Sequence, residues 1–167
     1  MSFHDPNQHR NRGGVPVGFV AELDAIEAAS VVYLRLWCDG PQSRSLIEAD
    51  FVEGLGQASG KAAFKSFEDL TRMCIRHGRR PLMHHAVQCK YVGSDEACFA
   101  NFIASAVEGD REDALMIATL LARPDVAPII ASLATQFGLA LKRMQLKAPR
   151  DSTGDLTAPA NQSNRLH

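Results

Sequence analysis

Residues 94–107 read SDEACFANFIASAV and predict the clearest helix of the chain. The apolar positions of this stretch recur at intervals of three and four residues: Phe99, Phe102, Ile103, Ala106 and Val107. Ser94 is a residue type that caps helices, and the two acidic residues after it suit the positive end of a helix dipole. This stretch therefore predicts an amphipathic helix with one buried face.

Two more helices are predicted after this one. Short breaks at 109–110 and 123–125 leave a helix at 114–122 and a last helix that begins near Asp125. The helix at 114–122 is apolar on nearly all sides, so neighbours or a second subunit must enclose it. The last helix has an apolar stripe of Val126, Ile129, Ile130, Leu133, Phe137, Leu141 and Met144. Connections this short favour antiparallel neighbours.

The first half of the chain shows the same period less regularly. Apolar residues spaced by three and four predict a first helix that follows Pro16 and ends at Gly40. The apolar face of this helix includes Phe19, Leu23, Ile26, Tyr33, Leu34 and Trp37. A capping pattern at 45–48 predicts a second helix, short or broken because a glycine-rich stretch follows at 53–60. We interpret that stretch as a helix connection rather than a phosphate loop. A third helix is expected over 61–77.

Taken together, the helical segments predict an all-α, single-domain bundle of about five helices over residues 16–147. The polar compositions of residues 1–15 and 148–167 predict a flexible N-terminus and a disordered C-terminal tail. Within the domain, Ala86–Val92 alternates like a strand. We expect the segment near 82–93 to be irregular, or to pair across a dimer axis, because no second strand is predicted.

The composition limits the class of protein. The chain has 167 residues, 18 basic and 19 acidic side chains and 46% hydrophobic residues, which is typical of one globular domain. At a net charge of -1, a nucleic-acid-binding surface is not expected. There is no apolar run that could span a membrane and no secretory signal, so we expect a cytoplasmic protein with reduced thiols.

The segment 70–94 departs most from the rest of the chain. It contains no acidic residue and five cations: Arg72, Arg76, Arg79, Arg80 and Lys90. Arginines around a helix end and a glycine turn can bind a phosphate or carboxylate through paired N–H donors. We therefore expect the segment to contact an anionic small molecule or an acidic protein surface. The alternative is an ordinary solvated face.

The same segment gathers sulphur and imidazole side chains. A rival hypothesis is a zinc site made of Cys74, His77, His84 or His85, and Cys89, because thiolate and imidazole suit tetrahedral zinc. The spacing matches no zinc pattern. Cys89, beside Lys90, is also the thiol best placed for ionisation, although the sequence identifies no oriented base for it.

These features favour a binding protein over an enzyme, since the sequence has no GxGxxG, GxxxxGK[ST], GxSxG, ExxH or HExxH motif. We expect a non-enzymatic, cytoplasmic helical protein that binds an anionic partner through residues 70–94. Its apolar helix at 114–122 favours a homodimer.

Overall fold

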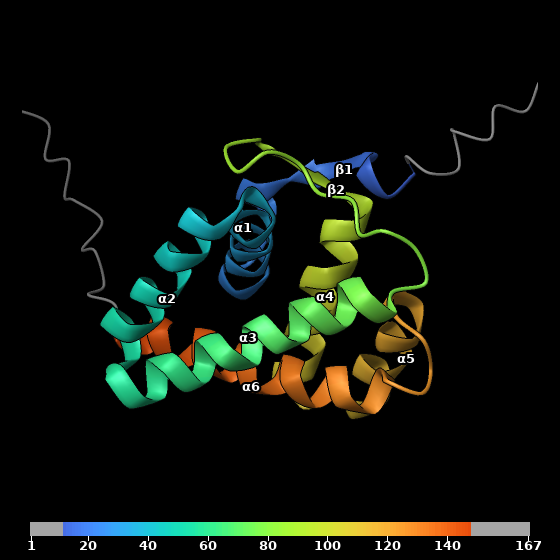
Figure 1. Cartoon of the computed structure of the whole chain (residues 1–167). Coiled ribbons are helices and arrows are strands. Elements are labelled where there is room, and N and C mark those ends of the chain that lie inside the picture. Colours follow the sequence, from blue (N-terminus) through green and yellow to red (C-terminus); the bar gives the residue numbers. More distant parts are fainter. Residues whose placement is uncertain (1–11, 148–167) are drawn as a thin grey trace, which may run out of the picture.

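The computed structural model describes residues 12–147 and confirms the predicted all-α fold (Figure 1). Its helices are α1 (Ala25–Asp39), α2 (Pro41–Leu55), α3 (Gln57–His77), α4 (Ser94–Glu108), α5 (Arg111–Leu121) and α6 (Ala127–Lys147). Two 3-10 turns (Arg12–Gly14 and Val20–Glu22) and two short strands, β1 (Pro16–Phe19) and β2 (Tyr91–Gly93), complete it. The expected tails lie outside the described residues, except that 12–15 belong to the fold.

The start of α1 differs from the prediction. The helix begins after Asp24, whose carboxylate accepts a hydrogen bond from the Glu27 N–H at 2.9 Å, while the Glu27 carboxylate accepts one from the Asp24 N–H at 3.3 Å. This reciprocal cap fixes the first turn. The prediction of a helix between Pro16 and residue 24 is therefore wrong, since β1 and a 3-10 turn fill that region.

The strand-like segment has a partner within the chain. β2 pairs antiparallel with β1, with Phe19 opposite Tyr91 and Pro16 opposite Gly93. Residues 82–90 are irregular, as expected, but the expectation that the strand would have no partner within the chain, or would pair across a dimer axis, is wrong. Strand pairing between distant segments leaves no local pattern in the sequence. β2 is also shorter than the predicted strand, because the residues before Tyr91 form a loop.

Within the glycine-rich stretch only Gly56 connects α2 to α3, and the rest of the stretch is helical. The prediction of a short or broken second helix is therefore wrong, since α2 is continuous over 15 residues. Both helices also begin earlier than expected. Pro41 occupies the first turn of α2, where its missing N–H costs nothing, so the predicted start at Ser45 is wrong. Gly56 joins the helices with a φ of 87°, a conformation that favours glycine. At Gly60 the helices approach so closely that a Cβ would lie 2.5 Å from the Phe51 carbonyl oxygen.

The last three helices form as the sequence pattern predicts, except that Gly93 and not Ser94 is the cap residue of α4. Gly109 ends α4 with a φ of 81°, and the Asp110 carboxylate accepts a hydrogen bond from the N–H of Asp113 at 3.1 Å. α5 is buried on one side only, at Ala114, Ile117 and Ala118. Its opposite side is exposed, at Leu115, Met116 and Leu120. The chain's own helices therefore enclose α5 incompletely.

The core lies where α3 and α6 pack against each other and against α1, α2 and α4. The rings of Phe67 and Phe137 lie 4.6 Å apart at its centre, and Trp37 meets Phe67 edge-on at 6.0 Å. The guanidinium groups of Arg44 and Arg72 lie 4.2 and 5.8 Å from the Trp37 ring. Aromatic pairs of this kind add to the stability that burial provides.

None of the helices in the described part of the chain has both the length and the apolar character needed to cross a membrane.

Candidate functional site

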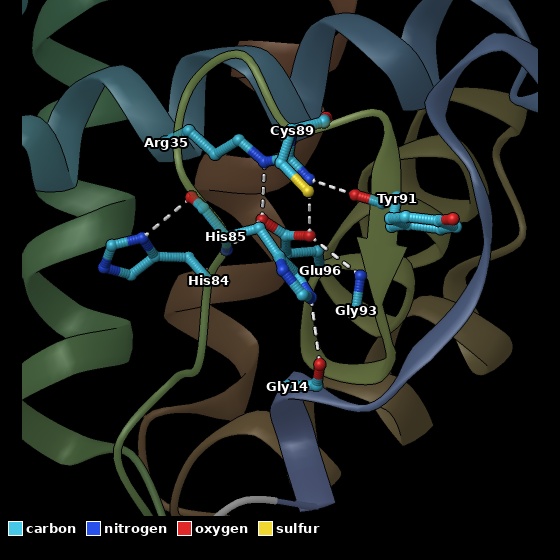
Figure 2. Close-up of polar contacts among 8 residues, drawn as sticks. All are labelled: Gly14, Arg35, His84, His85, Cys89, Tyr91, Gly93 and Glu96. Atoms are coloured by element: carbon cyan, nitrogen blue, oxygen red, sulfur yellow. Dashed lines mark hydrogen bonds and ion pairs between the residues drawn. The ribbon is translucent and has the colours of Figure 1, made fainter.

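A buried ion pair joins α1 to α4. The Arg35 guanidinium donates from Nε to Glu96 Oε1 at 2.7 Å and from Nη2 to Glu96 Oε2 at 2.9 Å (Figure 2). The two side chains are 1% and 0% exposed. Two buried charges are stable only when every donor and acceptor is satisfied, so the remaining contacts of this pair determine its role.

These remaining contacts hold the loop between α3 and β2, residues 78–90, and the strand that follows it. Arg35 also donates to the carbonyl oxygens of Cys89 and Tyr91, both at 2.6 Å. Glu96 accepts hydrogen bonds from the backbone N–H groups of His85 at 2.9 Å and Gly93 at 2.8 Å (Figure 2). One ion pair thus fixes four backbone groups of a segment with little regular structure.

The charge state of Glu96 follows from these contacts. Burial alone would raise the pKa of Glu96, but the hydrogen bonds from Arg35, Gly93 and His85 outweigh it and lower the pKa below its ordinary value. Glu96 is therefore ionised at neutral pH and keeps its attraction for the loop.

The neighbouring carboxylate holds the start of the same loop. Asp95 forms a two-pronged ion pair with the Arg80 guanidinium and accepts a hydrogen bond from the N–H of Met83 at 2.8 Å. The ring Nε2 of His85 lies 2.9 Å from the Gly14 carbonyl oxygen, which ties the loop to the N-terminal segment (Figure 2). The loop is thus exposed but anchored at several points.

The anchored loop forms one wall of a surface pocket of about 490 Å³. The pocket is lined by residues from the ends of α1 and α3 and from the loop: Cys38, Ile75, Gly78, Arg79, Arg80, Pro81, Leu82 and His84. Its volume falls within the range of small-ligand sites. Its lining combines the apolar residues Ile75, Pro81 and Leu82 with two arginines and a histidine.

The five cations predicted to bind an anion do not all meet there. Arg79 and Arg80 line the pocket. Arg72 pairs with Glu68 at 2.8 Å, and the amine of Lys90 lies 5.3 Å from the centre of the Tyr91 ring. Arg76 is exposed on α3 and is not among the lining residues. The basic segment is therefore divided over several surfaces, with two arginines at one site.

The residues of the zinc hypothesis are likewise not gathered. Cys74 is buried in the core, where burial raises the pKa of its thiol to about 12. His85 contacts Gly14, the carbonyl of His77 accepts a hydrogen bond from Arg123, and the carbonyl of Cys89 accepts one from Arg35. Among residues 12–147, no three His, Cys, Asp or Glu side chains are grouped so as to hold a metal ion.

Arg35, Asp95 and Glu96 are the residues whose role the sequence analysis missed. Arg35 lies four residues after the buried Val31 and next to Leu34, so an arginine on the apolar side of α1 is the available signal of a buried ion pair. Its partner is 61 residues away in the sequence, too far for a local pattern to identify. The acidic residues of the first turn of α4 look like ordinary helix-end charges.

Comparisons with known protein families, with curated proteins and with solved structures find no match for this chain. The function proposed below therefore rests on the pocket and on the contacts that hold its loop.

Proposed function

We propose that this chain is a non-enzymatic helical protein that binds a small anionic ligand in the pocket formed by the α3–β2 loop. The observation that carries the proposal is that an otherwise irregular loop is held by a buried ion pair and presents Arg79, Arg80 and His84 to one pocket. Loops that carry binding residues are commonly positioned by a rigid scaffold in this way.

The donors of Arg79 support anion binding. Its Nε donates to the carbonyl oxygen of Thr119 at 2.5 Å, which orients the guanidinium. Within residues 12–147 its two terminal nitrogens have no hydrogen-bond partner, so both can donate to one phosphate or carboxylate group. The charge of Arg80 is balanced by Asp95, so Arg79 supplies the uncompensated positive charge of the pocket.

Backbone carbonyl groups at the ends of helices repel anions, but two of those near this site already accept hydrogen bonds. The carbonyl of His77 accepts a hydrogen bond from the N–H of Arg123 at 3.0 Å, and that of Leu121 accepts one from the N–H of Arg79 at 3.3 Å. These bonds reduce the negative potential of the helix ends. Ile75, Pro81 and Leu82 provide apolar contact area, which favours an anion that has a hydrocarbon part.

Calorimetric titration with inorganic phosphate and with hexanoate tests this proposal. The matched variants are Arg79→Gln, in the pocket, and Arg76→Gln, an exposed arginine of the same segment outside it. We expect Arg79→Gln to weaken binding about 10- to 100-fold, since a charged hydrogen bond contributes about 1.5–3 kcal/mol, and Arg76→Gln to leave it unchanged.

Absence of binding by both anions would overturn the small-ligand proposal. Binding that Arg79→Gln does not weaken would overturn the choice of pocket. A glutamate-rich peptide that binds where neither small anion does would instead indicate that the pocket receives an acidic side chain of a protein partner.

The proposal further includes a cytoplasmic homodimer. The exposed apolar side chains of α5 support self-association, because monomeric proteins seldom leave large apolar side chains clustered on one exposed helix face.

A further inference from the structure

The exposed face of α5 changes from acidic to apolar along the helix and is followed by a basic residue. Asp113, Met116 and Leu120 are spaced by three and four residues and share one face, and Arg123 follows the helix end. Met116 and Leu120 are 59% and 65% exposed. These exposed fractions make the face accessible to another molecule, and α5 lies at the side of the molecule opposite α2 (Figure 1).

The acidic end of this face carries uncompensated charge. Asp110, Glu112 and Asp113 lie within four positions of each other, and the charge of Asp110 raises the pKa of Asp113. Within residues 12–147 these three carboxylates form no ion pair. A cation brought to this end from outside would therefore relieve the repulsion among them.

The opposite end has an accessible cation. Arg123 pairs with Asp125 at 2.5 Å, and the two side chains are 60% and 57% exposed. Arg123 also donates from Nε to Asp125 Oδ1 at 3.0 Å, so the pair is two-pronged, but both side chains are open to solvent and Nη1 of Arg123 has no hydrogen-bond partner within residues 12–147. This nitrogen can therefore donate to a second carboxylate. The face thus carries an acidic group at its start and two apolar residues after it, and a basic group follows beyond the helix end.

We propose that a second copy of this chain covers this face, with the two α5 helices antiparallel about a two-fold axis. Asp113 then faces the partner's Arg123, and Met116 faces the partner's Leu120. Both pairs are centred on position 118, as a single two-fold axis requires. This inference rests on the proposed self-association and adds its geometry.

The complementarity favours a copy of the chain over an unrelated partner. In an antiparallel pair each acidic end meets a basic end, whereas a parallel pair would place like charges together. The same four positions are used on both subunits, so one sequence pattern supplies both halves of the interface.

Sedimentation equilibrium of the full chain tests whether the apolar part of the face forms the contact. The variant Leu120→Glu is compared with Leu46→Glu, which changes a leucine of similar exposure (59%) on α2. We expect Leu120→Glu to weaken the dimer at least about 100-fold, because every dimer loses two buried leucines, and Leu46→Glu to leave it unchanged.

Charge exchange tests the antiparallel arrangement. Asp113→Lys and Arg123→Asp should each weaken the dimer, and the double variant Asp113→Lys/Arg123→Asp should recover most of the affinity because the charges again oppose. A monomeric wild-type chain would overturn both this inference and the proposed self-association. A dimer that resists Leu120→Glu, or that the charge exchange does not restore, would overturn only the α5 geometry, and neither result bears on anion binding.

Discussion

Arg35 lies between two helices and the loop that forms the pocket. Its guanidinium contacts Glu96, the Cys89 carbonyl of the loop and the Tyr91 carbonyl of β2. Glu96 in turn accepts hydrogen bonds from the N–H groups of His85 in the loop and Gly93 in β2. A charge in such a position is stable only with its full set of partners. The pair therefore couples the packing of α1 on α4 to the shape of the loop.

Replacement of Arg35 by Met should destabilise the protein by about 3–5 kcal/mol, because the charge of Glu96 stays buried without its partner. Urea denaturation measures this change. The control Arg143→Met alters an exposed residue and should stay within about 0.5 kcal/mol of wild type. A loss as small as that of the control would mean that the loop and the two helices do not depend on the pair.

The lowered pKa of Glu96 predicts a pH-dependent contribution to stability. Because the folded state favours the ionised carboxylate, this contribution is present above the ordinary pKa of 4.5 and is lost as the pH falls through it towards the lower folded-state value. Wild type should therefore keep its full advantage over Glu96→Gln well above pH 4.5 and lose it progressively as the pH falls below 4.5. Denaturation curves at several pH values measure the difference, and a constant difference would contradict the prediction.

At the scale of elements, the sequence predicted what is determined locally. α4, α5 and α6 have their caps and apolar stripes within single segments, so their existence and order could be derived. The strand β1 could not be derived in this way, because its apolar residues also fit a helical period and its hydrogen-bond partner, β2, is far along the chain. Local periodicity does not distinguish these alternatives.

Only part of the candidate site could be predicted, because the contacts that gather its residues are not local in the sequence. Composition singled out the segment of Arg79, Arg80 and His84, which line the pocket. It gave no means of separating them from Arg72 and Lys90, whose directions depend on helix geometry and on contacts with Glu68 and Tyr91. Tertiary contacts decide which cations of a basic segment meet.

The crossing of α2 and α3 predicts different costs for two glycine substitutions. At Gly60 a Cβ would meet the α2 backbone at 2.5 Å, which no rotation of a side chain relieves, whereas at Gly56 only the φ of 87° opposes alanine. Gly60→Ala should cost more than about 3 kcal/mol and Gly56→Ala about 1–2 kcal/mol. Thermal unfolding compares them, and equal losses would contradict the close crossing.

At the scale of the whole molecule, the N-terminal segment, the loop and α4 form one connected unit. The Gly14 carbonyl lies 2.9 Å from the ring Nε2 of His85, the Val15 carbonyl accepts a hydrogen bond from Ser94, and β1 pairs with β2. The loop of this unit lines the pocket, and Arg79 of the loop donates to the Thr119 carbonyl of α5.

The proposed dimer predicts that stability depends on protein concentration. When unfolding separates two subunits, a higher concentration favours the folded dimer, so the melting temperature should rise with concentration. Calorimetric scans of wild type measure this shift, and scans of Leu120→Glu should show none. A wild-type melting temperature that stays constant would argue against a dimer of this kind.

Trp37 is the chain's single tryptophan, 2% exposed and placed between Phe67 and the guanidinium groups of Arg44 and Arg72. Its intrinsic fluorescence therefore reports on one place, the junction of α1, α2 and α3. Emission should shift to longer wavelength when this junction opens to water, whereas release of the α3–β2 loop alone should leave its wavelength nearly unchanged. A single optical signal can thus distinguish unfolding of the core from opening of the pocket.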